Sequence, residues 1–167
     1  RHLIGYELQK IFAVVDWFST QSQDDVKIGT IGWGEGGMLA LYAGAIDTRI
    51  DAVCVSGYFN SRQKVWKEPL ERNVFGLLTQ FGDAELASMV APRHLVIEAA
   101  DFPEVHVPAG TGGAAPADLV TPSLDQIETE VERAQSIVNK LNPKPKIELI
   151  QAESSIYGTV ESLQSLL

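Results

Sequence analysis

The sequence has little cysteine, little positive charge and no long apolar run, and each shortage excludes a class of protein. Cys54 is the only cysteine among 167 residues, so an internal disulfide is excluded; a reducing compartment fits, and a secreted protein without disulfides stays open. No apolar run approaches the roughly 20 residues that span a bilayer. The 13 lysines and arginines face 22 aspartates and glutamates, a net charge of −9. Such a chain lacks the basic surface that nucleic acid or an anionic membrane requires.

What the sequence does contain is typical of one globular domain. Its 167 residues suffice for a single core and are too few for two ordinary domains, and 45% of them are hydrophobic and 21% charged. We therefore treat residues 1–167 as one domain. The first residue is Arg1 rather than methionine, and we expect the natural product to begin further upstream.

Helical and strand patterns alternate along the chain. Apolar residues at spacings of four and three predict a first helix over residues 3–20, through Ile4, Leu8, Ile11, Val15 and Phe18. Strands are expected at residues 26–31, 50–56, 94–99 and 147–152. Further helices are expected up to about residue 46, over 71–81, over 84–90 with Asp83 as N-cap, from a capping box of Ser123 and Gln126 to Asn142, and over 160–167. This order predicts an α/β fold with three α/β/α layers around a parallel sheet, the first strand lying at an edge.

One long segment interrupts the alternation. Residues 101–122 are rich in proline, glycine and alanine, and a loop of this length inside a small domain is usually functional or disordered.

The most informative stretch joins the first strand to the second helix. Gly32-Trp33-Gly34-Glu35-Gly36 forms a glycine-rich turn, and the small residues Gly37, Ala40 and Gly44 follow on one helix face. A helix with such a face can pack close to a sheet. We expect the strand to end near Ile31, because Gly32 and Gly34 tolerate backbone angles that other residues resist. A strand, sharp turn and helix with the pattern G-x-S-x-G is the setting of a hydrolase nucleophile, but here Gly34 occupies the serine position.

The chain resembles the dienelactone-hydrolase and acetyl-xylan-esterase branch of the α/β-hydrolase superfamily over about residues 1–160. The resemblance rests on the glycine turn and on four further stretches, Val53-Cys54-Val55-Ser56-Gly57-Tyr58-Phe59, Asn73-Val74-Phe75-Gly76-Leu77-Leu78, Phe81-Gly82-Asp83 and Ala91-Pro92-Arg93. More narrowly, the turn is similar to that of bacterial, planctomycete-type proteins described as acetyl xylan esterase-like. The resemblance implies the C-terminal half of the fold, without its N-terminal strands, and a secreted or periplasmic location.

The resemblance also implies a catalytic triad, which this chain matches only in part. The nucleophile position is Gly34, which has no hydroxyl, and residues 151–158 after the fourth strand contain no histidine. Candidates for the acid are Glu98, Asp101 and Glu104, and the backbone N–H of Glu35 would serve the oxyanion hole. Without its triad a hydrolase keeps roughly 10³–10⁴-fold acceleration over water, so we expect little or no esterase activity.

Three residues could still support catalysis, and each of them also has a simpler structural interpretation. Glu35 could act as an acidic nucleophile or base, although a carboxylate in the first helical turn is also the expected partner of the helix dipole. His106, close to Glu104, could be a displaced base, whereas loop histidines are commonly just solvated. Ser56 could be a relocated nucleophile at the carboxyl end of the second strand, or only a local hydrogen-bond donor.

Two ligand-binding hypotheses remain open alongside a purely structural module. A small ester or carbohydrate would lie over the glycine turn and the loops after Gly57 and Ala100, and its candidate contacts include Gly32, Trp33, Ser56 and Tyr58. The loop after Gly57 also carries a mixed aromatic and basic group, Arg62, Trp66, Lys67 and Arg72. This group either binds a sugar or a carboxylate or is simply a solvated loop. Gly32-x-Gly34-x-x-Gly37 also satisfies the dinucleotide pattern, yet the second strand ends without the acidic residue that holds the ribose. We expect neither a metal nor a cofactor. We expect a partner chain or a further segment to cover the unpaired edge of the first strand, because exposed strand edges promote aggregation.

Overall fold

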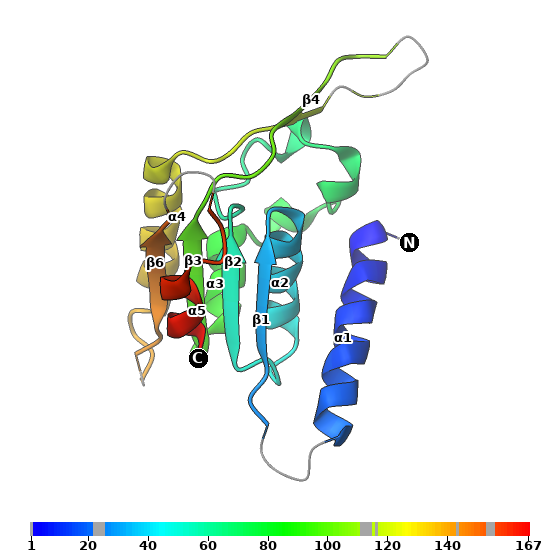
Figure 1. The fold of residues 1–167 in the computed structure, drawn as a ribbon. Helices are drawn as coiled ribbons and strands as arrows, with labels where there is room; N and C mark the ends of the chain where they lie inside the picture. The colour runs from blue at the N-terminus through cyan, green and yellow to red at the C-terminus, as the bar shows by residue number, and fades with distance from the viewer. Residues whose placement is uncertain (1, 22–25, 111–114, 116, 143, 153–155) are drawn as a thin grey trace.

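The computed structural model describes residues 2–21, 26–110, 115, 117–142, 144–152 and 156–167. Four parallel strands form the central sheet in the order β1-β2-β3-β6 (Figure 1). They are β1 (Gly29–Trp33), β2 (Ala52–Ser56), β3 (His94–Ala99) and β6 (Ile147–Gln151). The predicted parallel α/β sheet is therefore confirmed, with β1 at one edge.

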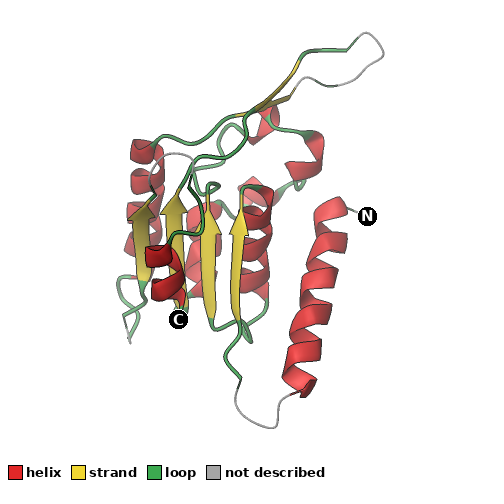
Figure 2. Cartoon of the chain, viewed as in Figure 1, coloured by secondary structure: helices red, strands yellow, loops and turns green. Residues whose placement is uncertain are grey.

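Helices cover both faces of this sheet, as the alternating pattern predicts (Figure 2). Helices α2 (Glu35–Ile46), α3 (Asp83–Val90) and α4 (Leu124–Val138) lie together on one face. Helix α5 (Val160–Leu166) packs on the other face against β2 and β3, and α1 (Leu3–Gln21) packs on α2. The main core lies between the sheet and α2–α4, and a smaller cluster of Cys54, Val96 and Ile150 with Leu166 lies under α5.

Helix α1 agrees with its predicted bounds, but its apolar stripe stops short. Ile4, Leu8 and Val15 are buried, and Ile11 packs partly against the core. Phe18, the last residue of the stripe, is exposed and touches Trp17 edge-on. None of the helices in the described part of the chain is long and apolar enough to cross a membrane.

The end of β1 corrects the prediction for the glycine turn. The strand runs to Trp33, two residues beyond the predicted end, and Gly32 remains inside it. Gly32 must lack a side chain because an added Cβ would lie 1.9 Å from the carbonyl oxygen of Gly36. The predicted close packing of α2 is confirmed, since a Cβ on Gly44 would lie 2.4 Å from Cγ2 of Val53.

Two predicted helical features between β2 and β3 were wrong. Residues 71–81 do not form one helix; the chain between β2 and α3 instead contains three 3-10 turns, η1 (Val65–Lys67), η2 (Leu70–Arg72) and η3 (Leu77–Thr79). Extended backbone at Asn73 and left-handed backbone at Gly76, with φ 77°, break the helix. The N-cap of α3 is Gly82, not Asp83, and Gly82 donates its N–H to the Glu85 carboxylate at 2.7 Å.

The long proline- and glycine-rich segment contains an element that the sequence pattern did not reveal. Strands β4 (Val105–Val107) and β5 (Ala117–Leu119) pair antiparallel and extend away from the sheet (Figure 1). Residues 111–114 and 116 lie outside the described part of the chain. Helix α4 begins as predicted, with the Ser123 N–H donated to Gln126 at 3.2 Å, and ends at Val138 instead of Asn142.

Arg93 shows why an arginine stands directly before β3. Its guanidinium donates to the carbonyl oxygens of Gly44 (2.7 Å), Asp47 (3.0 Å) and Ile50 (2.7 Å). It thereby joins the end of α2 to the chain entering β2, and satisfies carbonyl groups that the end of a helix leaves without partners.

Candidate functional site

The turn between β1 and α2 bends sharply at Gly34. Gly34 adopts φ 55° and ψ −115°, angles that residues with a side chain rarely adopt. Its N–H donates to the Ser56 carbonyl at 2.9 Å, and its own carbonyl accepts from Met38 at 3.1 Å. Gly37 allows this closeness, because a Cβ there would lie 2.9 Å from the Ser56 oxygen. The predicted strand–turn–helix is confirmed, with a glycine at its tip.

Phe102, which the sequence analysis did not single out, lies against Gly34 at the tip of the turn. A Cβ on Gly34 would stand 3.7 Å from Cβ of Phe102, at ordinary contact distance. The segment carrying Phe102 is fixed nearby because the Trp33 indole donates to the Asp101 carbonyl at 2.8 Å. A side chain at position 34 would therefore meet Phe102. Only the position of Phe102, next to a predicted acid, hints at this in the sequence.

An aromatic pair joins the end of β1 to the sequence after β6, in which the resemblance implies a histidine. The rings of Trp33 and Tyr157 stack with centroids 4.1 Å apart and planes 11° apart. Tyr157 follows β6, the fourth strand of the sheet in chain order. A Cβ on Gly57 would lie 3.2 Å from the Trp33 ring, so Gly57 leaves room for the indole. Trp33, predicted as a ligand contact, thus contacts other residues of the protein.

Glu98 is the candidate acid that the sheet places best. Trp33, Ser56 and Glu98 lie side by side in the register of β1, β2 and β3. The Glu98 carboxylate is 1% exposed and accepts five hydrogen bonds: from the Ser56 hydroxyl, the Gly158 N–H (2.7 Å), the Thr159 N–H and hydroxyl (both 2.8 Å) and the Ser162 hydroxyl (2.5 Å).

These donors decide the charge of Glu98. Burial raises the pKa of the carboxyl, but the hydrogen bonds from Ser162, Ser56, Thr159 and Gly158 outweigh it and lower the pKa to about 2. The group is an anion whose partners come from β2 and from the start of α5. Its hydrogen-bonding capacity is used in holding these elements together.

The other predicted catalytic groups lie apart from one another. Glu35 forms an ion pair with Arg72 at 2.8 Å, and partial burial raises its pKa. Glu104 accepts the backbone N–H of Thr121 at 3.1 Å. His106 lies on β4, where it pairs with Asp118 of β5. The His106 side chain is 78% exposed, on the hairpin that extends from the sheet (Figure 1). Its role as a base stays a prediction.

The aromatic and basic loop group divides into an inner and an outer part. Tyr58 is buried, with the guanidinium groups of Arg62 and Arg72 5.0 and 5.4 Å from its ring centre. Trp66 is 71% exposed, and the Lys67 ammonium lies 5.2 Å from its ring centre. The predicted binding group is therefore not one continuous surface.

Comparison of sequences matches the chain to no protein-family model and to no curated protein. Its structure is similar to that of a promiscuous CE15 esterase from the marine bacterial metagenome, at 15% identity and a TM-score of 0.58. It is also similar to a glucuronoyl esterase from Solibacter usitatus, at 12% identity and a TM-score of 0.58. These matches cover 97% and 98% of this chain. The chain therefore shares their fold, a parallel α/β sheet flanked by helices.

The chain spans about half the length of these esterases, 46% and 47% respectively. The similarity to about half of each esterase confirms the predicted α/β fold with a parallel sheet flanked by helices. At sequence identities this low, structural similarity does not establish that this chain has the same activity. The narrower resemblance to the dienelactone-hydrolase and acetyl-xylan-esterase branch stays a prediction.

Proposed function

We propose that this chain is an esterase-fold domain that hydrolyses esters slowly or not at all and acts by binding a ligand or a partner. The observation that carries the proposal is Gly34, a residue without a nucleophilic atom at the strained tip of the turn. Phe102 lies beside that tip, where a Cβ on Gly34 would be in ordinary contact with it. An acyl-enzyme requires an attacking oxygen or sulfur at such a position.

The groups around the turn support the same conclusion. Glu98 accepts hydrogen bonds from backbone and hydroxyl donors of residues 158–162, in the place where an acid would orient a histidine. The sequence after β6 contains no histidine. The scaffold alone would leave roughly 10³–10⁴-fold acceleration over water, far below ordinary enzyme rates.

The strongest alternative is a relocated nucleophile at Ser56. Its hydroxyl donates to Glu98, so a serine and a carboxylate are already paired at the carboxyl end of the sheet. Against it stands the burial of Ser56, which is 1% exposed and lies beside a carboxylate of low pKa that is a poor base at neutral pH. A dinucleotide on the turn is a weaker alternative, and a shift of the melting temperature by NAD(H) or FAD would favour it.

Ester turnover distinguishes these possibilities. Since the two similar structures are esterases, the substrates to use are 4-nitrophenyl acetate and a methyl glucuronoyl ester. We expect release no faster than with a control protein of similar composition, and no gain in Gly34→Ser, because a serine there has no base. Turnover that survives in Gly34→Ala and disappears in Ser56→Ala would contradict the proposal and establish Ser56 as the nucleophile. The melting temperature of each variant shows that it is folded.

A further inference from the structure

A network of charged side chains leads from the buried Asp83 to Glu35, which lies in the first turn of α2 at the candidate site. Nη1 of Arg62 donates to one oxygen of Glu68 at 2.7 Å, and Nε of Arg72 donates to the other at 2.8 Å. Nη1 of Arg72 then donates to Glu35 at 2.8 Å. At the other end, the charge of Arg62 lowers the pKa of Asp83. These five residues form the charge network.

The charge network contains more acids than bases. Two guanidinium groups face three carboxyl groups, so full ionisation would leave one negative charge in excess. Arg62 and Arg72 are only 3% and 4% exposed, and an uncompensated charge in such a place is costly. Glu68 accepts from a guanidinium on each of its oxygens and is poorly suited to hold a proton. A proton that balances the network therefore belongs at one of its ends, Asp83 or Glu35.

Asp83 has the surroundings of a carboxyl that holds this proton. It is 1% exposed, and it accepts from the Tyr58 hydroxyl and the Asn60 N–H, both at the long distance of 3.3 Å. Burial raises the pKa of Asp83 to about 7, even though Arg62 lowers it. The titratable and charged groups that act on it are Arg62 and Tyr58 from the chain after β2, Tyr42 from α2, and Glu130, paired with Arg133, from α4. Asp83 therefore changes its charge near neutral pH.

Glu35 is the end of the network that is free to respond to such a change. Its side chain is 45% exposed, against 12% for Glu68. Partial burial raises the pKa of Glu35, Arg72 lowers it, and the neighbouring carboxylates Glu7 of α1 and Glu71 raise it. An added negative charge in the network competes with Glu35 for the arginines, and Glu35 has water available in their place.

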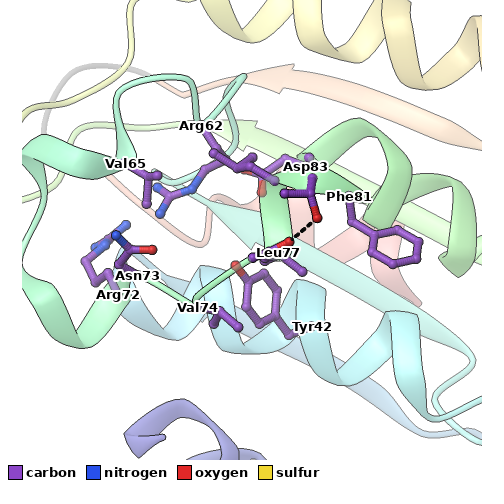
Figure 3. A pocket seen from close by; sticks show the side chains of 13 residues that line it. Tyr42, Arg62, Val65, Arg72, Asn73, Val74, Leu77, Phe81 and Asp83 are labelled. Atoms are coloured by element: carbon purple, nitrogen blue, oxygen red, sulfur yellow. Dashed lines mark hydrogen bonds between the residues drawn. The ribbon is translucent and has the colours of Figure 1, made fainter.

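The structure also leaves room for the arginines to change partners. Figure 3 shows Arg62, Arg72 and Asp83 around one cavity, which has a volume of about 270 Å³. Nη2 of Arg62 has no hydrogen-bond partner within the described residues, and an unpaired buried donor is costly. A charged Asp83 would give this internal donor an acceptor.

We propose that the ionisation of Asp83 controls how firmly Arg72 holds Glu35, and that the candidate site thereby responds to pH near neutrality. While Asp83 is neutral, the other four charges balance and Glu35 stays on Arg72. When Asp83 loses its proton, it attracts Arg62, Glu68 relies more on Arg72, and Glu35 turns toward water. As regulation of a ligand site this rests on the proposed function, whereas the coupling of the two carboxyl groups does not.

Carbon-13 NMR of the side-chain carboxyl groups tests this coupling without any ligand. The chemical shifts of Cγ of Asp83 and Cδ of Glu35 are followed from about pH 4 to about pH 9 in the natural chain, in Asp83→Asn and in Glu132→Gln. Glu132→Gln is the control, because it removes a carboxyl at an exposed position of α4 outside the charge network. Interacting carboxyl groups titrate together, so Glu35 in the natural chain should show a second inflection at the pH at which Asp83 titrates.

Asp83→Asn should remove the second inflection of Glu35, and Glu132→Gln should keep it. The proposal is overturned if Asp83 does not titrate near neutral pH, if Glu35 shows a single inflection in the natural chain, or if the second inflection survives in Asp83→Asn. If Asp83→Asn does not fold, the two titrations in the natural chain still decide. Ester turnover tests the proposed function separately, so failure of the coupling and failure of that function give different results.

Discussion

At the scale of single residues, the glycines of the β1–α2 turn differ in whether the structure has room for a Cβ atom. Gly32 and Gly37 have backbone oxygens where a Cβ would stand, whereas Gly36 has no atom within 4 Å of that position. Gly34 has room for a Cβ beside Phe102, and its φ of 55° is the obstacle to a side chain. The four glycines therefore tolerate a side chain to different degrees, although the sequence shows them only as one glycine-rich motif.

Gly32→Ala and Gly36→Ala form a matched pair that tests this distinction. We expect Gly32→Ala to destabilise the fold by about 3 kcal/mol or more, because its Cβ would overlap backbone atoms that cannot rotate away. Gly36→Ala should be neutral or stabilise by about 0.5–1 kcal/mol, since Gly36 lies in the first turn of α2. Urea unfolding measures both, and equal losses in the two variants would contradict the geometry.

At the scale of elements, the Glu98 carboxylate connects α5 to the sheet. The Gly158 and Thr159 N–H groups and the Ser162 hydroxyl lie at or just before the start of the helix, and Ser56 belongs to β2. A short helix on an otherwise sparsely covered sheet face is thus fixed by one buried anion in addition to apolar contacts around Leu166.

The stability of this connection should depend on pH. The folded pKa of Glu98, about 2, lies below the ordinary value of 4.5, so its contribution is complete above pH 5 and is lost as the pH falls toward 2. The shift corresponds to a contribution on the order of 3 kcal/mol. Between pH 7 and pH 3 the unfolding free energy should therefore fall more steeply for the natural chain than for Glu98→Gln.

Urea unfolding at several pH values measures this difference, and Glu132→Gln, at an exposed position of α4, is the control. The control should follow the natural chain. Parallel pH curves for the natural chain and Glu98→Gln would show that Glu98 does not hold α5 in this way.

The elements differ in how far the sequence could predict them. Helices α1, α2 and α4 and the four sheet strands have strong apolar patterns, and their existence and order were predictable. The chain over 71–81 was predicted to be helical, and the left-handed backbone at Gly76 decides against that. The three-residue strands β4 and β5 are too short to show alternation.

The site was less predictable, because its key contacts join distant parts of the chain. The turn was recognisable from local spacing, and Glu98 was a candidate from its place at the end of a strand. The contact of Phe102 with Gly34, the stacking of Trp33 on Tyr157 and the unpaired donor of Arg62 need three-dimensional neighbours. No local pattern encodes them.

At the scale of the whole molecule, a fold similar to that of two esterases carries a glycine at the tip of its β1–α2 turn. The chain spans about half the length of the esterases it is similar to, and β1 lies at the edge of the sheet within the described residues. The expectation that a partner chain or a further segment covers that edge stays a prediction.

The most direct test of the absent nucleophile is intact-mass spectrometry after incubation with a serine-directed fluorophosphonate. Such probes add covalently to activated hydroxyl groups in esterase folds, so the reaction reports the nucleophile independently of any substrate preference. The account predicts that the folded chain keeps its unmodified mass, with Gly34 at the turn. A single stoichiometric adduct that maps to Ser56, and is absent from Ser56→Ala, would contradict it.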